Sequence, residues 1–384
     1  MLLSLLSAGN FVIGMGAFVI FGILGPMAAD LGISNGEAGH VLTVYALAYA
    51  VSSPLAVAAT GRLSRRTVLA GGMALFTLSA LGSALAPGPS ALYAARALGA
   101  LGAGVFTPVA ASVAAATSAS DERGRALSRV FLGLTLAQVL GVPVGSFLAY
   151  SFGWRSSFLA VAALAAPCAA ALLLLVPRQL AFQPTRLASL ATMLGDWRTM
   201  LAVAFTVSYL VPIYVVYTFL GPLLEATMGF GRNGVTAAFL ALGCGAVTGN
   251  LVGGLLSDRV GPGPTLVGLA LLQVAILPLF STLPLPPWLF FALAFGWASC
   301  GWSLIAPQQA RLIRIAPDAQ AVVLALNAAA IYLGAAGGSA AGATLIGLLG
   351  LGGLGIAAGA MALVGVANIL LARAFRPRHL PSTT

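Results

Sequence analysis

Gly249-Asn250-Leu251-Val252-Gly253-Gly254-Leu255-Leu256-Ser257-Asp258-Arg259-Val260-Gly261 ends one long apolar run of the sequence, and its polar Ser-Asp-Arg turn leads into another. A similar stretch, Thr60-Gly61-Arg62-Leu63-Ser64-Arg65-Arg66-Thr67, lies between two apolar runs in the first half of the chain. A turn that recurs at the same place in two halves is typical of a duplicated architecture. The sequence therefore predicts two related halves.

The composition predicts a membrane protein. Of the 384 residues, 60% are hydrophobic and 7% are charged, whereas roughly a quarter of the residues in soluble domains are charged. All 18 basic residues are arginine, and the net charge is +10. These arginines lie in short turns, without the interleaved aromatic residues of a nucleic-acid surface. We therefore expect a lipid bilayer and no nucleic acid as partner.

Twelve apolar runs are long enough to cross about 30 Å of hydrocarbon, which takes roughly 20 helical residues. The runs lack the two-residue alternation of barrel strands, so each is expected to be a helix. The predicted fold class is an all-α polytopic membrane protein with twelve transmembrane helices, at residues 8–29, 39–59, 67–87, 91–116, 127–150, 156–176, 200–222, 235–256, 264–283, 288–308, 320–345 and 348–372.

The distribution of arginines predicts the orientation of the chain. If the N-terminus is inside, the inner loops, the adjoining helix ends and the C-terminal tail hold all but three of the 18 arginines. Only Arg96, Arg155 and Arg232 remain for the outer half. The positive-inside rule then predicts that both termini are cytoplasmic.

The longest stretch that is not apolar, 177–199, divides the predicted spans six and six. We expect it to be a cytoplasmic linker between an N-terminal half at 1–176 and a C-terminal half at 200–384, which ends in a short tail. The two halves would be pseudo-symmetric about an axis along the membrane normal. Gly245, Gly249 and Gly253 recur every four residues, a spacing that predicts close helix packing.

Several patterns that suggest other chemistry have simpler explanations. Cys168, Cys244 and Cys300 lie in three different apolar runs with no C-x-x-C, so neither a metal site nor a disulfide is expected. Gly32-Ile33-Ser34-Asn35-Gly36 matches a hydrolase elbow, but Ser34 and Glu37 fit the capping box of a following helix. No nucleotide-binding G-x-x-x-x-G-K-[ST] occurs, so no ATP-driven pump and no cofactor are expected.

Further stretches follow one another on corresponding runs: Phe11-Val12-Ile13-Gly14, the segment from Gly25 to Ser34, Tyr45-Ala46-Leu47-Ala48-Tyr49, Arg96-Ala97-Leu98-Gly99, Gly141-Val142-Pro143-Val144-Gly145 and Gly153-Trp154-Arg155. Together with the G-x-L-x-D-R-x-G loop that ends at Gly261, they resemble the major facilitator superfamily. The resemblance is closest to its bacterial drug and sugar efflux branch, which includes arabinose-exporter-like permeases and drug:proton antiporters. It covers essentially the whole chain.

This resemblance implies a set of gating residues: Gly61, Arg65, Gly141, Pro143, Gly145, Asp258 and Arg259. The glycines and Pro143 would let the fifth span bend and lie against a helix of the other half, because proline lacks an amide donor. Asp258 is placed to accept from amides at a helix start in the other half, as a cytoplasmic latch. The first copy departs from the pattern, since Ser64-Arg65-Arg66 stands where the family usually has Asp-Arg.

The residues that would couple transport to protons are unusual in this chain. The branch usually has an acid in the first span, where this chain has Ala17. All eight acidic residues lie in loops or at span ends, so no midplane carboxylate is available as a proton relay. We expect transport to depend weakly on a pH gradient unless Asp30 or His40 provides the coupling.

Polar and aromatic tips in otherwise apolar runs are the candidate substrate contacts, since such groups face protein or water rather than lipid. They are Tyr45, Tyr49, Arg96, Gln138, Tyr214, Tyr217, Asn250, Trp297, Asn327 and Tyr332. Each could instead hydrogen-bond between helices. For Arg96 two explanations stand: Asp30 or helix carbonyls neutralise it, or its guanidinium binds an anionic or strongly hydrogen-bonding substrate.

We expect a monomeric secondary active transporter, not an enzyme, that exports a small organic molecule such as a drug, sugar or metabolite by alternating access across a bacterial inner membrane. The resemblance implies proton antiport. The alternative is a proton-independent facilitator, or an exporter of an anionic or polar metabolite. An intramembrane enzyme would need paired titratable groups at membrane depth, and a receptor or structural protein would leave the repeated loop unexplained.

Overall fold

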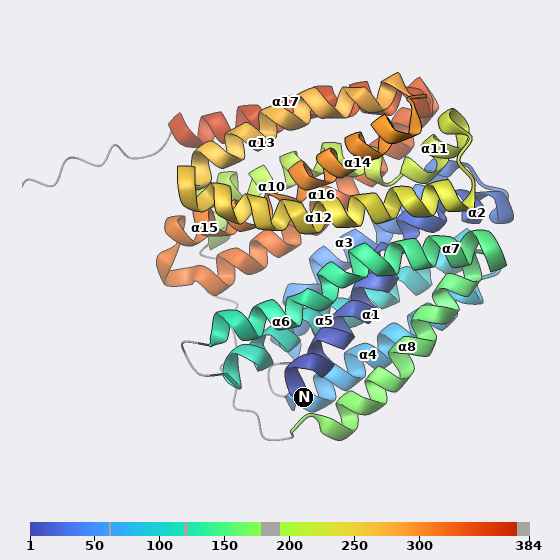
Figure 1. Cartoon of the computed structure of the whole chain (residues 1–384). Coiled ribbons are helices and arrows are strands. Elements are labelled where there is room, and N and C mark those ends of the chain that lie inside the picture. The colour runs from blue at the N-terminus through green and yellow to red at the C-terminus, as the bar shows by residue number, and fades with distance from the viewer. Residues whose placement is uncertain (61–62, 119–121, 178–192, 375–384) are drawn as a thin grey trace, which may run out of the picture.

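The computed structural model describes residues 1–60, 63–118, 122–177 and 193–374, which form helices joined by short turns (Figure 1). Its first part contains α1 (Leu2–Phe18), α2 (Ile20–Leu31), α3 (Asn35–Ala59), α4 (Arg65–Ala84), α5 (Pro89–Ala116), α6 (Arg123–Leu136), the π-helix η1 (Ala137–Gly141), α7 (Val142–Phe152) and α8 (Trp154–Leu175). The second part contains α10 (Trp197–Tyr217), α11 (Leu220–Met228), α12 (Arg232–Val260), α13 (Pro262–Ile276), η2 (Leu277–Thr282), α14 (Pro287–Trp302), α15 (Ile305–Ile315), η3 (Pro317–Ala319), α16 (Gln320–Leu349), η4 (Leu351–Gly353) and α17 (Leu354–Ala374).

The helices reproduce the predicted spans. Among the described residues, ten continuous or gently bent helices are long and apolar enough to cross a membrane. The pair α1 and α2, bent by 40°, adds an eleventh. The remaining predicted span, 39–59, corresponds to the 25-residue helix α3. The predicted linker 177–199 lies largely outside the described residues, since only 177 and 193–199 of it are described.

The capping box predicted from the sequence is confirmed. Glu37 Oε2 accepts from the backbone N–H of Ser34 at 2.9 Å, and the Ser34 hydroxyl oxygen accepts from the N–H of Glu37 at 3.1 Å. These reciprocal bonds satisfy amide donors that lack partners at a helix start. Ser34 is therefore the N-cap of α3, and its hydroxyl group is engaged in the capping box.

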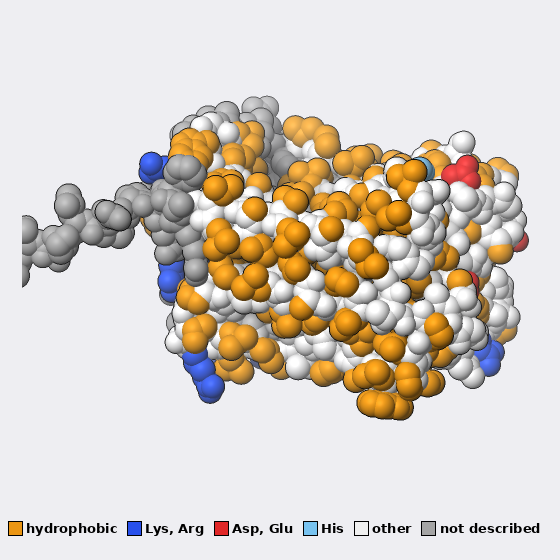
Figure 2. Space-filling view, turned by 90° about the horizontal axis from the view of Figure 1, so that it is seen from above, with side chains coloured by type: hydrophobic (Ala, Val, Ile, Leu, Met, Phe, Trp, Pro, Cys, Tyr) orange, Lys and Arg blue, Asp and Glu red, His pale blue; other side chains and the backbone are white. Residues whose placement is uncertain are grey.

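Charged side chains define the two ends of the molecule. In Figure 2, arginines gather at one end, and the acidic side chains in view lie at the other end, where a basic one also shows. Hydrophobic side chains cover the surface between the ends, as expected of a face in contact with lipid. We call the end that carries Arg66, Arg129, Arg259 and Arg314 the inner end and the opposite end the outer end.

Two helix bundles lie side by side in Figure 1, α1–α8 in blue to green and α10–α17 in yellow to red. Within the second bundle, the glycine ridge of α12 packs on the backbone of α14. A side chain at Gly249 or Gly253 would collide with the carbonyl oxygen of Ser299 or Ser303. The ridge predicted from the spacing therefore brings two helices of the same bundle into contact.

The apolar core is shared between the bundles only toward the outer end. Residues at the outer end of the first bundle, such as Phe21 and Phe158, belong to one core with Phe219 and Trp297 of the second. Toward the inner end, the buried residues of the first bundle form a second cluster, which includes Leu6, and Tyr332 of the second bundle packs against it. A third cluster, around Ala202 and Leu312, contains described residues of the second bundle alone.

The glycine ridge provides a test of the helix packing. Gly253→Ala should lower the free energy of unfolding by about 1–3 kcal/mol, because the added methyl group meets the main chain of α14. The measurement is thermal unfolding of the purified protein in detergent. Gly268→Ala is the matched control, because a Cβ atom there faces open space. Equal stability of the two variants would contradict the observed packing.

Candidate functional site at the seam between the halves

We define the seam as the contact surface that α2, α3, η1 and α7 of the first bundle make with α10, α11, α12 and α16 of the second. Backbones approach closely along it. The Ser339 hydroxyl on α16 donates to the carbonyl oxygen of Gly39 on α3 at 2.7 Å. A Cβ atom placed on Gly243 of α12 would lie 2.6 Å from Cα of Val139 on η1. Small residues therefore let the two bundles touch backbone to backbone.

Aromatic side chains fill the middle of the seam. The rings of Tyr49 on α3 and Tyr332 on α16 stack with their centroids 3.6 Å apart, and Tyr45 lies 6.5 Å from Tyr49. Nearby, Phe21 of α2 packs on Tyr217 of α10 at 4.3 Å. The structure thus brings together five predicted substrate contacts: Tyr45 and Tyr49 on α3, Tyr214 and Tyr217 on α10, and Tyr332 on α16.

The four remaining uncharged candidates divide into two pairs. Gln138 on η1 and Asn250 on α12 are half-buried, and Asn250 lies two turns from Gly243 on the same face of α12, which is turned toward the seam. Asn327 instead accepts from Thr206 at 2.6 Å, inside the second bundle. Trp297 donates to Gln273, also inside that bundle. The first pair can reach a ligand at the seam, while the second pair connects helices.

Arg96 is buried in the first bundle, with 2% of its surface exposed. It donates to the carbonyl oxygens of Gly16 at 2.8 Å and Ala17 at 3.3 Å, and its guanidinium lies 4.3 Å from the ring centroid of Tyr45. Helix carbonyls therefore neutralise it, as one of the two explanations expected.

The expectation that Asp30 pairs with Arg96 is wrong. Asp30 accepts from Arg155 and from the indole N–H of Trp154 at the outer end. Both partners of this carboxylate lie in the first turn of α8, at its outer end. His40, the other candidate for coupling, is exposed near the start of α3.

The end of α1 explains the position of Arg96. The last four carbonyls of a helix lack intrahelical donors, and the helix dipole places partial negative charge there. Gly16 and Ala17 belong to this last turn, because α1 ends at Phe18 and the chain bends before α2 begins. Arg96 thus caps a broken helix at Ala17, where the resemblance implied an acid.

The fifth span does lie against a helix of the other half, α12, as expected, but its predicted gating glycines pack within the first bundle. A Cβ atom on Gly141 would lie 3.1 Å from Met15 of α1, and one on Gly145 would collide with Val19. The seam instead uses Gly243, a glycine of the other bundle. The π-helix η1 comes directly before the turn of α7 that contains Pro143, so the regular helical hydrogen bonding is interrupted where the sequence predicted a bend.

The predicted cytoplasmic latch is not formed in this conformation. Asp258 and Arg259 are exposed at the inner end of α12, and neither has a hydrogen bond or ion pair within the described residues. Arg65 is buried at the first position of α4. Gly61 lies outside the described residues. The latch between these elements stays a prediction for the conformation in which the inner end closes.

Two polar groups that the sequence interpretation missed connect three helices of the first bundle. The amide of Asn10 on α1 donates to the carbonyl oxygen of Val130 on α6 at 3.1 Å, and its oxygen accepts from Thr107 on α5 at 3.0 Å. Asn10 is fully buried, so these bonds compensate its loss of water. Asn10 could have been identified from the sequence, because it is a polar residue within an apolar run.

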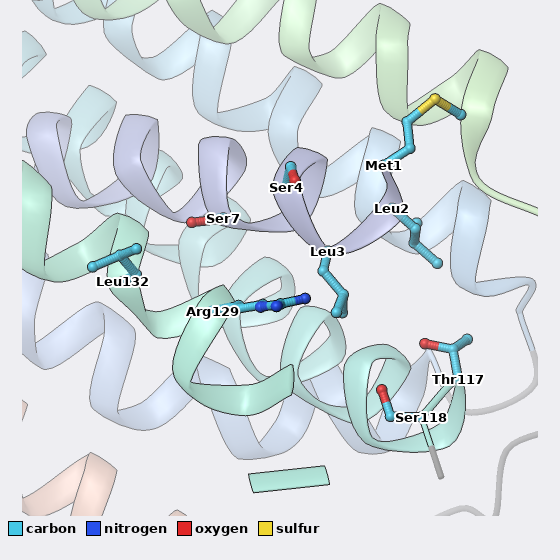
Figure 3. A pocket seen from close by; sticks show the side chains of 9 residues that line it. All are labelled: Met1, Leu2, Leu3, Ser4, Ser7, Thr117, Ser118, Arg129 and Leu132. Atoms are coloured by element: carbon cyan, nitrogen blue, oxygen red, sulfur yellow. The ribbon is translucent and has the colours of Figure 1, made fainter. Parts of the chain in front are cut away.

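A pocket of about 540 Å³ opens at the inner end, among α1, α6 and the turn after α5 (Figure 3). Ser4, Ser7, Ser118 and Arg129 contribute polar groups to its walls. Its volume is in the range of pockets that hold small organic ligands. The sequence interpretation used Arg129 only for membrane orientation.

Known proteins match nearly the whole chain. Residues 6–338 match the family description "Major Facilitator Superfamily". The inner membrane transport protein YdhP of Escherichia coli strain K12 is 31% identical over 344 residues, which cover 89% of this chain and 87% of that protein. The chloramphenicol resistance protein of Streptomyces lividans is 32% identical, covering 90% of this chain and 89% of its own length.

Solved structures agree on the fold. The D-xylose-proton symporter superposes with a TM-score of 0.79 at 18% identity, with 97% of each chain covered. A bacterial homologue of the human lysosomal transporter Spinster, in its inward-facing and unoccupied conformation, superposes with a TM-score of 0.77 at 16% identity, covering 97% of this chain and 96% of that one. The chain therefore belongs to the major facilitator superfamily and is a multi-pass membrane transporter rather than an enzyme.

Proposed function

We propose that this protein exports a small, uncharged organic molecule by alternating access across a bacterial inner membrane, with its arginine-rich inner end in the cytoplasm. The observation that supports this most is the distribution of the apolar core, which joins the bundles toward the outer end and is separate for each bundle toward the inner end. From this distribution we infer an inward-open state, closed to the outside. An exporter loads its substrate in that state.

Export, and membership of the drug and sugar efflux branch, are supported by the relatives. The name of the Streptomyces lividans protein refers to chloramphenicol resistance, and that protein matches 90% of this chain. Chloramphenicol carries no formal charge and combines an aromatic ring with hydroxyl and amide groups. A ligand of this chemistry suits a seam that contains tyrosine and amide side chains.

The charges around the seam also favour an uncharged substrate. Ala17 supplies no carboxylate to attract a lipophilic cation. Arg96 is occupied by two helix carbonyls and is shielded from solvent, so it offers little to an anion. Gln138, Asn250 and Tyr332 supply neutral donors and acceptors. These groups select among ligands by hydrogen bonding, since an unmatched buried polar group costs about 1–3 kcal/mol.

The region around Ala17 and Arg96 favours a second candidate function, which is transport without stoichiometric proton exchange. The C-terminal end of α1 compensates the charge of Arg96 permanently, because a carbonyl group cannot release or take up a proton. The proton antiport that the resemblance implies would need another titratable group with access to both faces in turn.

A ligand panel tests the substrate class. We expect thermal stabilisation of the purified protein by chloramphenicol or neutral sugars, and none by tetraphenylphosphonium or by organic carboxylates. Tyr49→Ala should weaken binding of a neutral ligand by roughly tenfold, because it removes the ring stacked on Tyr332. Tyr93→Phe is the control, since its hydroxyl bonds the backbone of Glu37 near the start of α3, away from the seam. Stabilisation by the cation alone would contradict the proposal.

Flux into proteoliposomes tests the coupling. Wild-type flux of a panel ligand should change less than about threefold when a pH gradient of one unit is imposed, although such a gradient supplies about 1.4 kcal/mol per proton. Ala17→Glu should increase that dependence, since the Arg96 guanidinium already reaches the backbone of residue 17. Ala17→Gln controls for the size of the side chain. If wild-type flux collapses when the gradient is dissipated, uncoupled transport is excluded.

A further inference from the structure

Glu225 bonds across the seam at the outer end. It lies on α11, which continues beyond α10 at the outer surface, and its carboxylate accepts from the hydroxyl of Tyr150 on α7. The carboxylate also lies directly on α2, because a Cβ atom placed on Gly25 would be 2.7 Å from Oε2. Within the part of the chain that the structure describes, no other acidic side chain bonds to a residue of the opposite bundle.

The surroundings of Glu225 contain few charges. Tyr150 is the only titratable residue of α7, Asp30 is the only one of α2, and η4 has none. Asp30 is occupied by Arg155 and Trp154. On the outer part of α12, Arg232 bonds Asn233 and Ser151 and lies on the Phe147 ring at 4.9 Å. No guanidinium or ammonium group is hydrogen-bonded to the Glu225 carboxylate among the described residues.

This contact lies next to the outer surface. A depression of about 440 Å³, lined by Tyr150 and residues 231–234, opens there. Tyr150, which bonds Glu225, therefore borders the outer medium, and Glu225 itself is only half-buried. A proton from the outer medium can therefore arrive at the carboxylate without crossing the seam.

We propose that Glu225 is a proton-binding site open to the outer medium, and that its protonation closes the outer end of the seam. This inference rests on the alternating access of the proposed function and is independent of the substrate. When the outer end opens, Tyr150 and Gly25 move away with the first bundle, and the carboxylate becomes hydrated and charged. When the outer end closes, the carboxyl group is again half-buried between α2 and α7.

The sign of the effect follows from burial. Removal from water raises the pKa of Glu225 above its ordinary value, and the Tyr150 hydrogen bond opposes this with a smaller effect. The closed state therefore binds a proton more tightly than the open state. Lowering the outer pH favours the closed state, and raising it favours the open state. A difference of one unit in pKa between the states changes their ratio by about tenfold.

Such a site regulates the carrier without driving it. The proton binds from the outside and returns to the outside when the outer end reopens, so no proton crosses the membrane in a cycle. After an exporter has released its substrate, outer acid promotes the return to the inward-open state. External pH would thus set the rate of the return step, while the pH gradient itself supplies no energy through this group.

Spin-label distances across the outer end test the proposal without any substrate. Phe152 and Ala226 are exposed residues that flank Tyr150 and Glu225 on the two bundles. We would label Phe152→Cys with Ala226→Cys in the full-length protein in lipid nanodiscs, after Cys244→Ser removes the exposed native thiol. Between about pH 5 and about pH 8, the share of the longer distance should rise at least roughly threefold.

Three variants separate the proposal from simpler explanations. Glu225→Gln mimics the protonated acid and should give the short distance at every pH. Tyr150→Phe should lower the closed share but keep the pH dependence, because Glu225 still titrates. Glu37→Gln changes another outer carboxylate and should behave like the parent. The inference is overturned if the populations of the two distances do not change with pH. It is also overturned if the pH response is still present in Glu225→Gln. A single distance in every sample would overturn alternating access itself.

Discussion

The close packing of α3 on α16, and of η1 and α7 on α12, holds the two bundles together. Only small side chains permit it, as at Gly39, where the backbone accepts a hydrogen bond from Ser339, and at Gly243, where the backbone of η1 lies in direct contact. Such contacts involve little side-chain rearrangement, so they can open and close as the bundles rock. The access state of the site at the middle of the seam depends on whether the outer contacts are formed.

Arg96 shows how this chain manages a buried charge without a carboxylate. A guanidinium in hydrocarbon is costly, and an acid in the first span is one way of compensating it. Here the break after α1 leaves carbonyl oxygens without helical donors, and the guanidinium occupies two of them. This arrangement keeps α1 bent and removes a proton-binding group from the centre of the protein. Among the described residues, the acid that bonds across the seam is Glu225, at the outer surface, where we propose that a proton acts on the conformation alone.

The fold could be predicted from the sequence because hydrocarbon thickness and backbone hydrogen bonding impose long apolar helices. The helix start at Ser34 was equally accessible, since the capping box is local. The partners of Arg96 and Asp30 were predicted less well, because side-chain pairing depends on how helices rotate about their axes. Gly141 and Gly145 were assigned to the wrong contact for the same reason. Glu225 was not singled out, because its significance comes from Tyr150, which is 75 residues away in the chain.

One measurement tests the claim that outer closure and inner opening are a single motion of the two bundles. A Cβ atom on Gly36 would lie 3.6 Å from Cα of Ala343, which is close enough for cysteines at these two positions to form a disulfide that locks the outer contact. Maleimide spin labels on Arg125→Cys and Arg314→Cys at the exposed inner end, attached in a Cys244→Ser background after the disulfide has formed, then report the inner distance. Their thioether bonds survive the reduction. The account predicts a single long inner distance in the oxidised protein and a second, shorter one after reduction. The same distribution before and after reduction would contradict it.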